Sequence, residues 1–223
     1  MLESREAVIL EALREMTGGV VLIGGYAVNA YVPPRFSIDC DLVVLDELDR
    51  IKGLLIEKGF DEIERGEVPK GEYFRFHRSR EKVTFDLLVN SVFDRETGVA
   101  FEGALFGKYS KERITVGRLH PVAISMRIAD PELLFAMKFV SARRQDIRDV
   151  FMLSGIELDW SLIKEMIKAK CGRELMEGRI GLIRSTVMSM SYRDSLQGSY
   201  GKIPDKTFNN CIRNLVKFLD GLM

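Results

Sequence analysis

Three carboxylates lie in segments of this chain that otherwise have the composition of buried β-strands. Asp39 and Asp41 lie in RFSIDCDLVV, and Asp86 lies in KVTFDLLV. Successive strand side chains point to opposite faces of a sheet, so Asp39 and Asp41 share a face and Cys40 points to the other. Two carboxylates so close together in a partly desolvated place repel each other unless a cation lies between them. Carboxylate oxygens suit hard divalent ions, and the pattern therefore predicts bound Mg²⁺.

Length and composition predict a folded protein without a membrane segment. The 223 residues can form one large or two small domains, and 46% of them are hydrophobic, enough for a core. The chain has no apolar run of about 18 residues, and its first 16 residues resemble an acid-containing amphipathic helix rather than a signal peptide. We therefore expect a cytoplasmic protein. Cys40, Cys171 and Cys211 lack CxxC spacing, so we expect buried, unpaired thiols.

Charge is unevenly distributed along the chain. Lys and Arg together number 33, as do Asp and Glu, yet residues 161–223 contain 11 basic and 6 acidic residues. An acidic metal-binding part beside a part that contacts nucleic acid would show this distribution. Helices with ordinary solvated faces would show it too. Charge alone leaves both interpretations open.

Hydrophobic periodicity and turn residues predict an α+β chain in two parts. Helices are expected over residues 3–16, 26–31 and 46–58, and strands over residues 20–23, 37–45, 60–66, 72–78 and 82–89. From Asp130, a plausible N-cap followed by Pro131, nearly every segment has helical spacing. We place the boundary near residue 125, which predicts domains of residues 1–125 and 126–223.

A pair of glycines, Gly24 and Gly25, separates the first strand from the short helix. Backbone N–H groups at a helix start bind anions, and glycine lets phosphate oxygens approach closely. The 13 residues between Gly25 and Asp39 suffice for one short helix and a return. The paired acids would then lie beside a phosphate site.

Arg35 and Ser37 precede the paired acids at alternating positions. In an extended backbone their side chains point the same way as those of Asp39 and Asp41, and a guanidinium there suits a triphosphate. A lone di-glycine more often marks a turn, and a lone pair of acids can simply end a strand. Their combination with Asp86 on a second strand is what indicates a nucleotide site. No GxxxxGK[ST] or GxGxxG motif competes with it.

These motifs resemble those of the DNA polymerase β-like nucleotidyltransferase superfamily. Gly24 and Gly25 match its helix-opening G[GS], Asp39 and Asp41 its DxD, and Asp86 its third acid. The string RFSIDCDL is similar to the form found in the AbiEii abortive-infection toxin branch. The resemblance spans roughly residues 18–155 and implies a palm-like mixed sheet flanked by helices, followed by a C-terminal helical domain. Gly25 replaces the serine of many members, which leaves only backbone donors there.

A second segment, KFVSARRQDIRDVFML, is similar to the K…R…RDxxD stretch of that branch. The resemblance assigns Lys138, Arg143 or Arg144, Asp146 and Asp149 to the nucleotide site. Helical spacing would place Lys138 and the two acids on one stripe of a helix, from which Lys138 would reach the triphosphate. Ordinary salt bridges from Arg143 or Arg144 to the two acids are the alternative.

The resemblance implies an enzyme that transfers NMP from an NTP to an acceptor hydroxyl and releases pyrophosphate. Two Mg²⁺ ions held by Asp39, Asp41 and Asp86 would escort the triphosphate and lower the pKa of the acceptor hydroxyl. Lys138 and Arg35 would stabilise the leaving group. The AbiEii branch further implies tRNA or another RNA as acceptor and an antitoxin protein as partner. AMP transfer to a small molecule or protein, and a non-catalytic nucleotide-binding or interaction module, are the alternatives.

Overall fold

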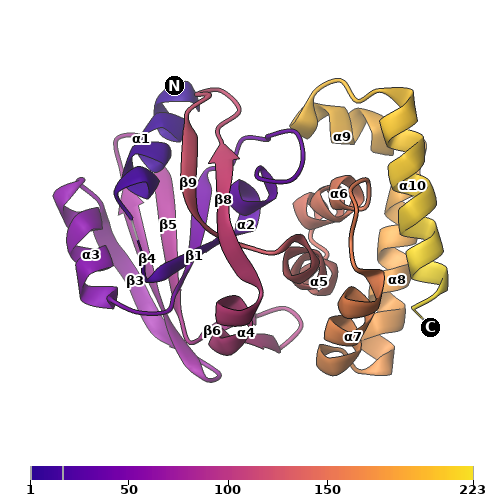
Figure 1. Cartoon of the computed structure of the whole chain (residues 1–223), viewed down its shortest axis with the longest axis horizontal. Helices are drawn as coiled ribbons and strands as arrows, with labels where there is room; N and C mark the ends of the chain where they lie inside the picture. The colour runs from indigo at the N-terminus through magenta and orange to yellow at the C-terminus, as the bar shows by residue number, and fades with distance from the viewer. Residues whose placement is uncertain (1, 17, 223) are drawn as a thin grey trace. The chain divides into compact units, whose positions relative to one another are not determined.

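The computed structural model of the chain describes residues 2–16 and 18–222 (Figure 1). Its contacts divide it into two units. The first comprises residues 1–30, 34–93 and 100–130, and the second comprises residues 31–33, 94–99 and 131–223. A mixed sheet with flanking helices forms the first unit, and helices dominate the second. The predicted α+β class is therefore confirmed.

The first unit contains every helix and strand that the sequence predicted up to residue 89, with small shifts at their ends. Its elements are α1 (Leu2–Glu15), β1 (Val20–Ile23), α2 (Gly24–Val28), β2 (Asp39–Val44), α3 (Leu48–Glu57), β3 (Asp61–Val68), β4 (Gly71–Arg78), β5 (Val83–Val89), α4 (Gly103–Lys108), β8 (Ser110–Val116) and β9 (Ala123–Ala129). The elements after β5 were not predicted. A separate two-stranded sheet is formed by β6 (Ser91–Asp94) and β7 (Val99–Glu102).

The main sheet has seven strands in the order β3-β4-β5-β2-β1-β9-β8. β2 pairs antiparallel with β1 and parallel with β5, and β1 pairs parallel with β9. β3, β4 and β5 form an antiparallel meander. β1 and β2 are thus paired along both edges, and all four residues of β1 are buried, so both faces of β1 are covered.

The apolar face of the sheet packs against α3. Leu42 on β2 and Phe85 on β5 are fully buried, as are Ile51 and Leu55 on α3. The ring of Phe85 also makes an edge contact with that of Phe60, with centroids 5.2 Å apart. Each such side chain contributes roughly 1.5–3 kcal/mol when fully buried, so this layer fixes which face of β2 points inward.

The N-terminal helix α1 is held by one buried carboxylate. Glu6 is fully buried and accepts hydrogen bonds from the backbone N–H groups of Arg118, at 2.9 Å, and of Leu119 and His120, at 2.5 and 2.7 Å. These three N–H groups lie in the connection between β8 and β9, where no strand partner satisfies them. Glu6 therefore ties the first helix to the far edge of the sheet.

Six helices make up most of the second unit, in agreement with the helical periodicity after residue 130. They are α5 (Pro131–Ser141), α6 (Arg144–Leu153), α7 (Trp160–Lys170), α8 (Arg173–Val187), α9 (Tyr192–Tyr200) and α10 (Asp205–Asp220). Aromatic rings join three of them: Phe218 of α10 packs on Phe135 of α5 and on Trp160 of α7, with centroids 5.3 and 5.0 Å apart. Within residues 2–16 and 18–222, no helix has the length and apolar character needed to cross a lipid bilayer.

The prediction that Lys138, Asp146 and Asp149 lie along one helix is wrong. α5 ends at Ser141, and Ala142 adopts φ of 46°, in the left-handed region that interrupts a right-handed helix. Lys138 is therefore on α5, whereas both acids are on α6. Alanine has a high helix propensity, so the residue at position 142 does not predict the break.

We predict that Glu6→Ala destabilises the protein, because it leaves three backbone N–H groups in the β8–β9 connection without their acceptor. The free energy of unfolding should fall by about 1–3 kcal/mol, measured by urea denaturation. Glu11→Ala, at an exposed position of the same helix, is the matched control and should change it by less than about 0.5 kcal/mol. Equal effects of the two substitutions would contradict the proposed tie.

Candidate functional site

A row of charged side chains crosses four strands of the sheet. The pairing registers place Glu64 of β3 opposite Arg75 of β4, Arg75 opposite Asp86 of β5, and Asp86 opposite Asp41 of β2. Register partners point to the same face of a sheet, so the four side chains form one line. The predicted juxtaposition of the second and third acids thus follows from the parallel pairing of β2 with β5.

Asp39 belongs to the same face, two residues before Asp41. Cys40 between them is buried on the opposite face, as alternation predicted, and all three cysteines are buried and unpaired. Lost hydration, followed by repulsion from Asp86, raises the pKa of Asp39 above its usual 3.8, whereas Arg75 acts in the opposite direction. Lost hydration and a neighbouring carboxylate therefore both disfavour the ionised form of Asp39.

Gly24 lies directly against the carboxylate of Asp41. A Cβ atom at Gly24 would lie 2.0 Å from Asp41 Oδ2, and Gly24 has φ of 66°. Both the close approach and the left-handed backbone require glycine. This turn, between β1 and α2, lets the carboxylate lie beside the backbone.

Gly25, Arg35 and Ser37 come together on the other side of this turn. A Cβ atom at Gly25 would lie 2.9 Å from one guanidinium nitrogen of Arg35 and 2.9 Å from Ser37 Oγ. Arg35 is buried, with 6% of its surface exposed, and its guanidinium donates to the carbonyl of Phe36 at 3.2 Å. The predicted phosphate-binding residues are thus neighbours, although residues 35–38 are not part of a strand.

Two residues that sequence reasoning missed hold the segment before β2 in place. The side-chain amide of Asn29 donates to the carbonyl of Arg35 at 2.9 Å, and its oxygen accepts from the N–H of Arg35 at 3.0 Å. The hydroxyl of Tyr26 donates to the carbonyl of Ser37 at 2.9 Å. An asparagine that binds both backbone groups of one residue substitutes for a strand partner. Asn29 is buried, and a buried side-chain amide needs hydrogen-bond partners, which here are the backbone groups of Arg35.

Arg75 is the second omission of the sequence reasoning. Its Nε donates to Asp86 Oδ1 at 2.8 Å and its Nη2 to Asp86 Oδ2 at 2.9 Å, while Nη1 donates to Glu64 Oε2 at 3.2 Å. Its alternation with buried Phe74 and Phe76 indicates only that it points away from the core. That it meets Asp86 depends on the register between β4 and β5, which the sequence does not reveal.

The donor chemistry of Asp39 and Asp41 suits a divalent cation. Both offer carboxylate oxygens on one face of the sheet, and such oxygens are the ligands that hard divalent ions prefer. Asp86, the third predicted ligand, has both oxygens engaged by Arg75. Across the part of the chain that the structure describes, no three His, Cys, Asp or Glu side chains are grouped to hold a metal ion. The three-carboxylate Mg²⁺ site stays a prediction.

Lys138, Asp146 and Asp149 meet within the second unit. Lys138 Nζ lies 2.9 Å from Asp146 Oδ1 and 2.6 Å from Asp149 Oδ2, and 10% of the lysine side chain is exposed. Asp149 is fully buried and also accepts from the hydroxyl of Tyr200 at 2.6 Å. The lysine bridges the break between α5 and α6, so it has a structural role. Its predicted contact with a triphosphate stays a prediction.

The alternative pairing of Arg143 or Arg144 with these acids is wrong. Arg143 Nη2 instead lies 2.8 Å from Asp94 Oδ2, and Arg144 donates to Ser195 Oγ at 3.5 Å. The break at Ala142 alters the helical phase on which the expected pairing depended. The predicted part of Arg143 in nucleotide binding is not tested by these contacts.

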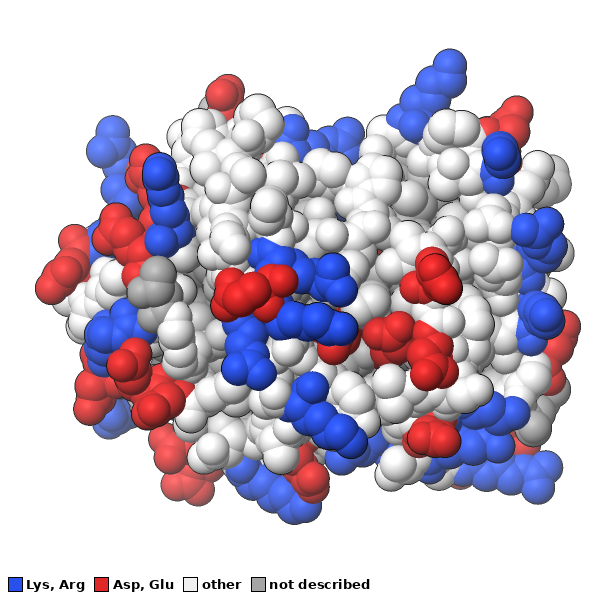
Figure 2. Space-filling model, viewed as in Figure 1, with Lys and Arg blue, Asp and Glu red and all other residues white. Residues whose placement is uncertain are grey.

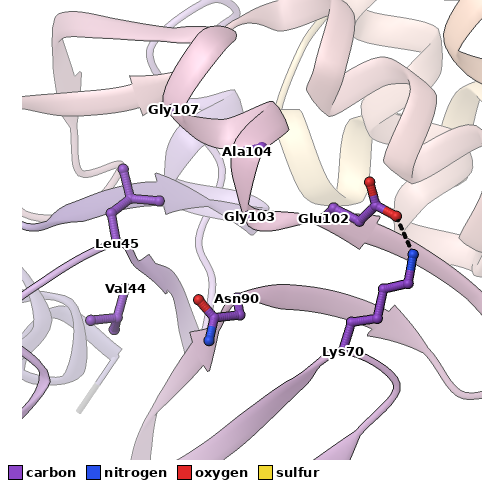
Figure 3. A pocket seen from close by; sticks show the side chains of 8 residues that line it. All are labelled: Val44, Leu45, Lys70, Asn90, Glu102, Gly103, Ala104 and Gly107. Atoms are coloured by element: carbon purple, nitrogen blue, oxygen red, sulfur yellow. Dashed lines mark hydrogen bonds and ion pairs between the residues drawn. The ribbon is translucent and has the colours of Figure 1, made fainter.

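A hollow of about 450 Å³ lies at the other end of β2 (Figure 3). Its polar contact is the ion pair of Lys70 with Glu102, at 2.6 Å. Its wall is formed by Val44, Leu45, Lys70, Asn90, Glu102, Gly103, Ala104 and Gly107. Since Val44 ends the strand that Asp39 begins, the hollow is separate from the row of acids.

Charged side chains of both signs are interspersed over the face of the molecule shown in Figure 2. Basic residues are not gathered there into one uniform surface. The excess of basic residues in 161–223 is consistent, on this face, with ordinary solvated helices.

Two solved structures from Helicobacter pylori are similar to the chain. The crystal structure of JHP933 is 15% identical in sequence, with a TM-score of 0.47 over 99% of this chain and 91% of the other. That of a candidate nucleotidyltransferase is also 15% identical, with a TM-score of 0.48 over 99% and 96%. No protein-family model and no curated protein sequence matches the chain. Likeness of this degree carries no information about activity.

We predict that Gly24→Ala destabilises the protein, because alanine strains the left-handed backbone and its methyl group collides with the carboxylate of Asp41. The expected loss is about 2–4 kcal/mol in the free energy of unfolding. Gly53→Ala is the matched control. Gly53 lies inside α3 with open space around it, so alanine there should stabilise the protein by about 0.5–1 kcal/mol. A neutral Gly24→Ala in urea denaturation would show that the turn tolerates a side chain.

The raised pKa of Asp39 predicts a pH-dependent stability difference between the wild type and Asp39→Asn. Well below pH 3.8 the carboxyl is protonated in both folded and unfolded chains, so the difference should become independent of pH. As the pH rises, ionisation is opposed only in the folded state, and the wild type should lose stability relative to Asp39→Asn. Denaturation without divalent ions from pH 3 to pH 7 measures this trend. A wild type that gains relative stability with rising pH would contradict it.

Proposed function

We propose that the chain is a Mg²⁺-dependent nucleotidyltransferase whose first unit carries the chemistry. The observation that supports this most directly is the register of β2 with β5, which sets Asp86 beside Asp41, while Asp41 lies against Gly24. Acids on adjacent strands next to a glycine turn bring together groups that suit a divalent ion and donors that suit phosphate.

Asp39 and Asp41 are the proposed ligands of Mg²⁺. When bound, the ion neutralises phosphate charge and lowers the pKa of an acceptor hydroxyl. The third ligand, which the resemblance assigns to Asp86, is on the same face, in contact with Arg75. The apolar side of β2, with Leu42 fully buried, keeps the two ligands in a fixed orientation.

Arg35, Ser37 and the backbone of Gly25 form the proposed phosphate site. Arg35 supplies a planar fork of donors that suits phosphate oxygens, and its backbone is clamped by Asn29. A clamped donor loses little conformational freedom on binding, which favours stabilisation of charge that develops on the leaving pyrophosphate. Ser37 adds one hydroxyl donor beside it.

In the proposed reaction, an acceptor hydroxyl attacks the α-phosphorus of an NTP. A bond forms between the acceptor oxygen and phosphorus, the bond to the bridging oxygen breaks, and pyrophosphate leaves with that electron pair. The acceptor proton passes to a base, for which Asp86 is the proposed residue. Arg35 balances charge on the departing phosphates.

The acceptor that we propose is tRNA or another RNA, with an antitoxin protein as a regulatory partner. Both suggestions rest on the similarity of RFSIDCDL and of the Lys138 to Asp149 segment to the AbiEii branch. Lys138, Arg143, Asp146 and Asp149 are proposed to contribute to nucleotide binding, as the resemblance implies. Because Asp149 is fully buried, its part would be to hold Lys138 in place.

The assay that tests this proposal uses each α-labelled NTP with Mg²⁺ and total tRNA. Label on RNA supports the proposed reaction, whereas label on protein or a small molecule supports the adenylyltransferase alternative. Absence of transfer with all four NTPs and both acceptor classes would refute an NMP transferase acting on them and favour a non-catalytic module.

We predict that Asp41→Asn abolishes transfer while the fold is retained, because the variant keeps the shape of the side chain and loses the charge that holds the ion. The rate should fall by at least about 100-fold, typical of losing a preorganised electrostatic contribution. Asp49→Asn is the matched control, since Asp49 lies on the exposed side of α3 and makes the same chemical change. Circular dichroism checks the fold. Retained activity in Asp41→Asn would overturn the assignment.

A further inference from the structure

Arg75 occupies a position in the acidic row where the proposed function leads one to expect a metal ion. It lies between Glu64 and Asp86, with bonds to both, and the register places Asp41 on the far side of Asp86. Three acids and one guanidinium thus lie side by side across four strands. The order is acid, cation, acid, acid.

The guanidinium is fixed by three hydrogen bonds from two directions. Two go to Asp86 in the bidentate geometry that fits a guanidinium to a carboxylate, and the third goes to Glu64. Glu64 is itself held, because the hydroxyl of Tyr73 donates to it at 2.6 Å. Arg75 is 41% exposed at its side chain, whereas Asp86 is 17% exposed. Asp86 is therefore the more deeply buried partner of this ion pair.

This arrangement leaves little of Asp86 for another cation. Both of its oxygens accept from Arg75, and an ion bound by Asp86 would face the positive charge of the guanidinium at close range. Arg75 also lowers the pKa of Asp39, so its charge acts beyond the two acids that it contacts. Asp86 is the acid of the row whose two oxygens Arg75 engages directly.

We propose that Arg75 is a positioning residue that reserves Asp86, so that Asp86 ligates no divalent ion in the free protein and only the single ion of the proposed function can bind. The inference rests on the proposed function and deepens it. Arg75 then serves as the second positive charge of the site. Asp86 remains oriented beside Asp41 without acting as a metal ligand.

The test is a Mn²⁺ titration of the whole chain followed by electron paramagnetic resonance, without nucleotide. The wild type should bind one ion, and the binding should be lost in Asp39→Asn/Asp41→Asn. Arg75→Gln should bind Mn²⁺ about ten-fold more tightly, the effect of removing one nearby like charge and freeing a ligand. Lys70→Gln is the matched control for lost charge, since Lys70 pairs with Glu102 in an exposed position, and it should stay within about two-fold.

A double variant separates a freed ligand from a general charge effect. Arg75→Gln/Asp86→Asn should return to the wild-type affinity, because it removes both the guanidinium and the carboxylate that it releases. An affinity gain that survives in the double variant would overturn the proposal, and so would an unchanged affinity in Arg75→Gln. Arg75→Lys keeps the charge without the planar fork and should give an intermediate gain, which provides a second variant if Arg75→Gln fails to fold.

The same titration distinguishes the inference from the proposed function. If Asp39→Asn/Asp41→Asn binds Mn²⁺ as the wild type does, the proposed ion site is wrong. If that variant loses binding while Arg75→Gln behaves like Lys70→Gln, the ion site stands and the role of Arg75 is wrong. Two ions bound to the wild type would also refute the reservation of Asp86.

Discussion

The register of β2 is the constraint on which the rest of the site depends. Leu42 and Val44 on one face pack into the core, and the strand is paired on both edges. Shifting the strand by one residue would turn Asp39 and Asp41 into the apolar layer and Leu42 out of it. The hydrophobic face of the strand thus determines where the carboxylates point, although it takes no part in the chemistry.

Placing several acids on one face of a sheet opposes folding, and two features reduce the cost. Arg75 neutralises Asp86 directly, and the glycine turn allows the carboxylate of Asp41 to lie close to the backbone of Gly24. Asp39 is left with a raised pKa, the sign of an unfavourable position for an ionised carboxyl. Natural sequences tolerate such local conflicts mainly at functional sites.

Local patterns in the sequence predicted β2, β5 and the short helix after Gly24, because alternation and glycine pairs depend on neighbouring residues. Arg75 was missed for the opposite reason. Its partner Asp86 is brought to it by pairing between strands, and nothing in EYFRFHR specifies which residue will lie opposite. The break at Ala142 was missed because alanine favours helices, so the left-handed backbone there reflects tertiary packing.

The parallel pairing of β2 with β5 has a consequence for how the chain folds. Parallel neighbours cannot be joined by a tight turn, and here α3, β3 and β4 intervene. The meander of β3, β4 and β5 is made of short-range contacts, whereas the β2–β5 ladder closes a long loop and has a high contact order. During synthesis, Asp41 leaves the ribosome well before its partner strand exists. We therefore expect the carboxylates to come together after the meander has formed, with Arg75 already in place to offset the repulsion among them.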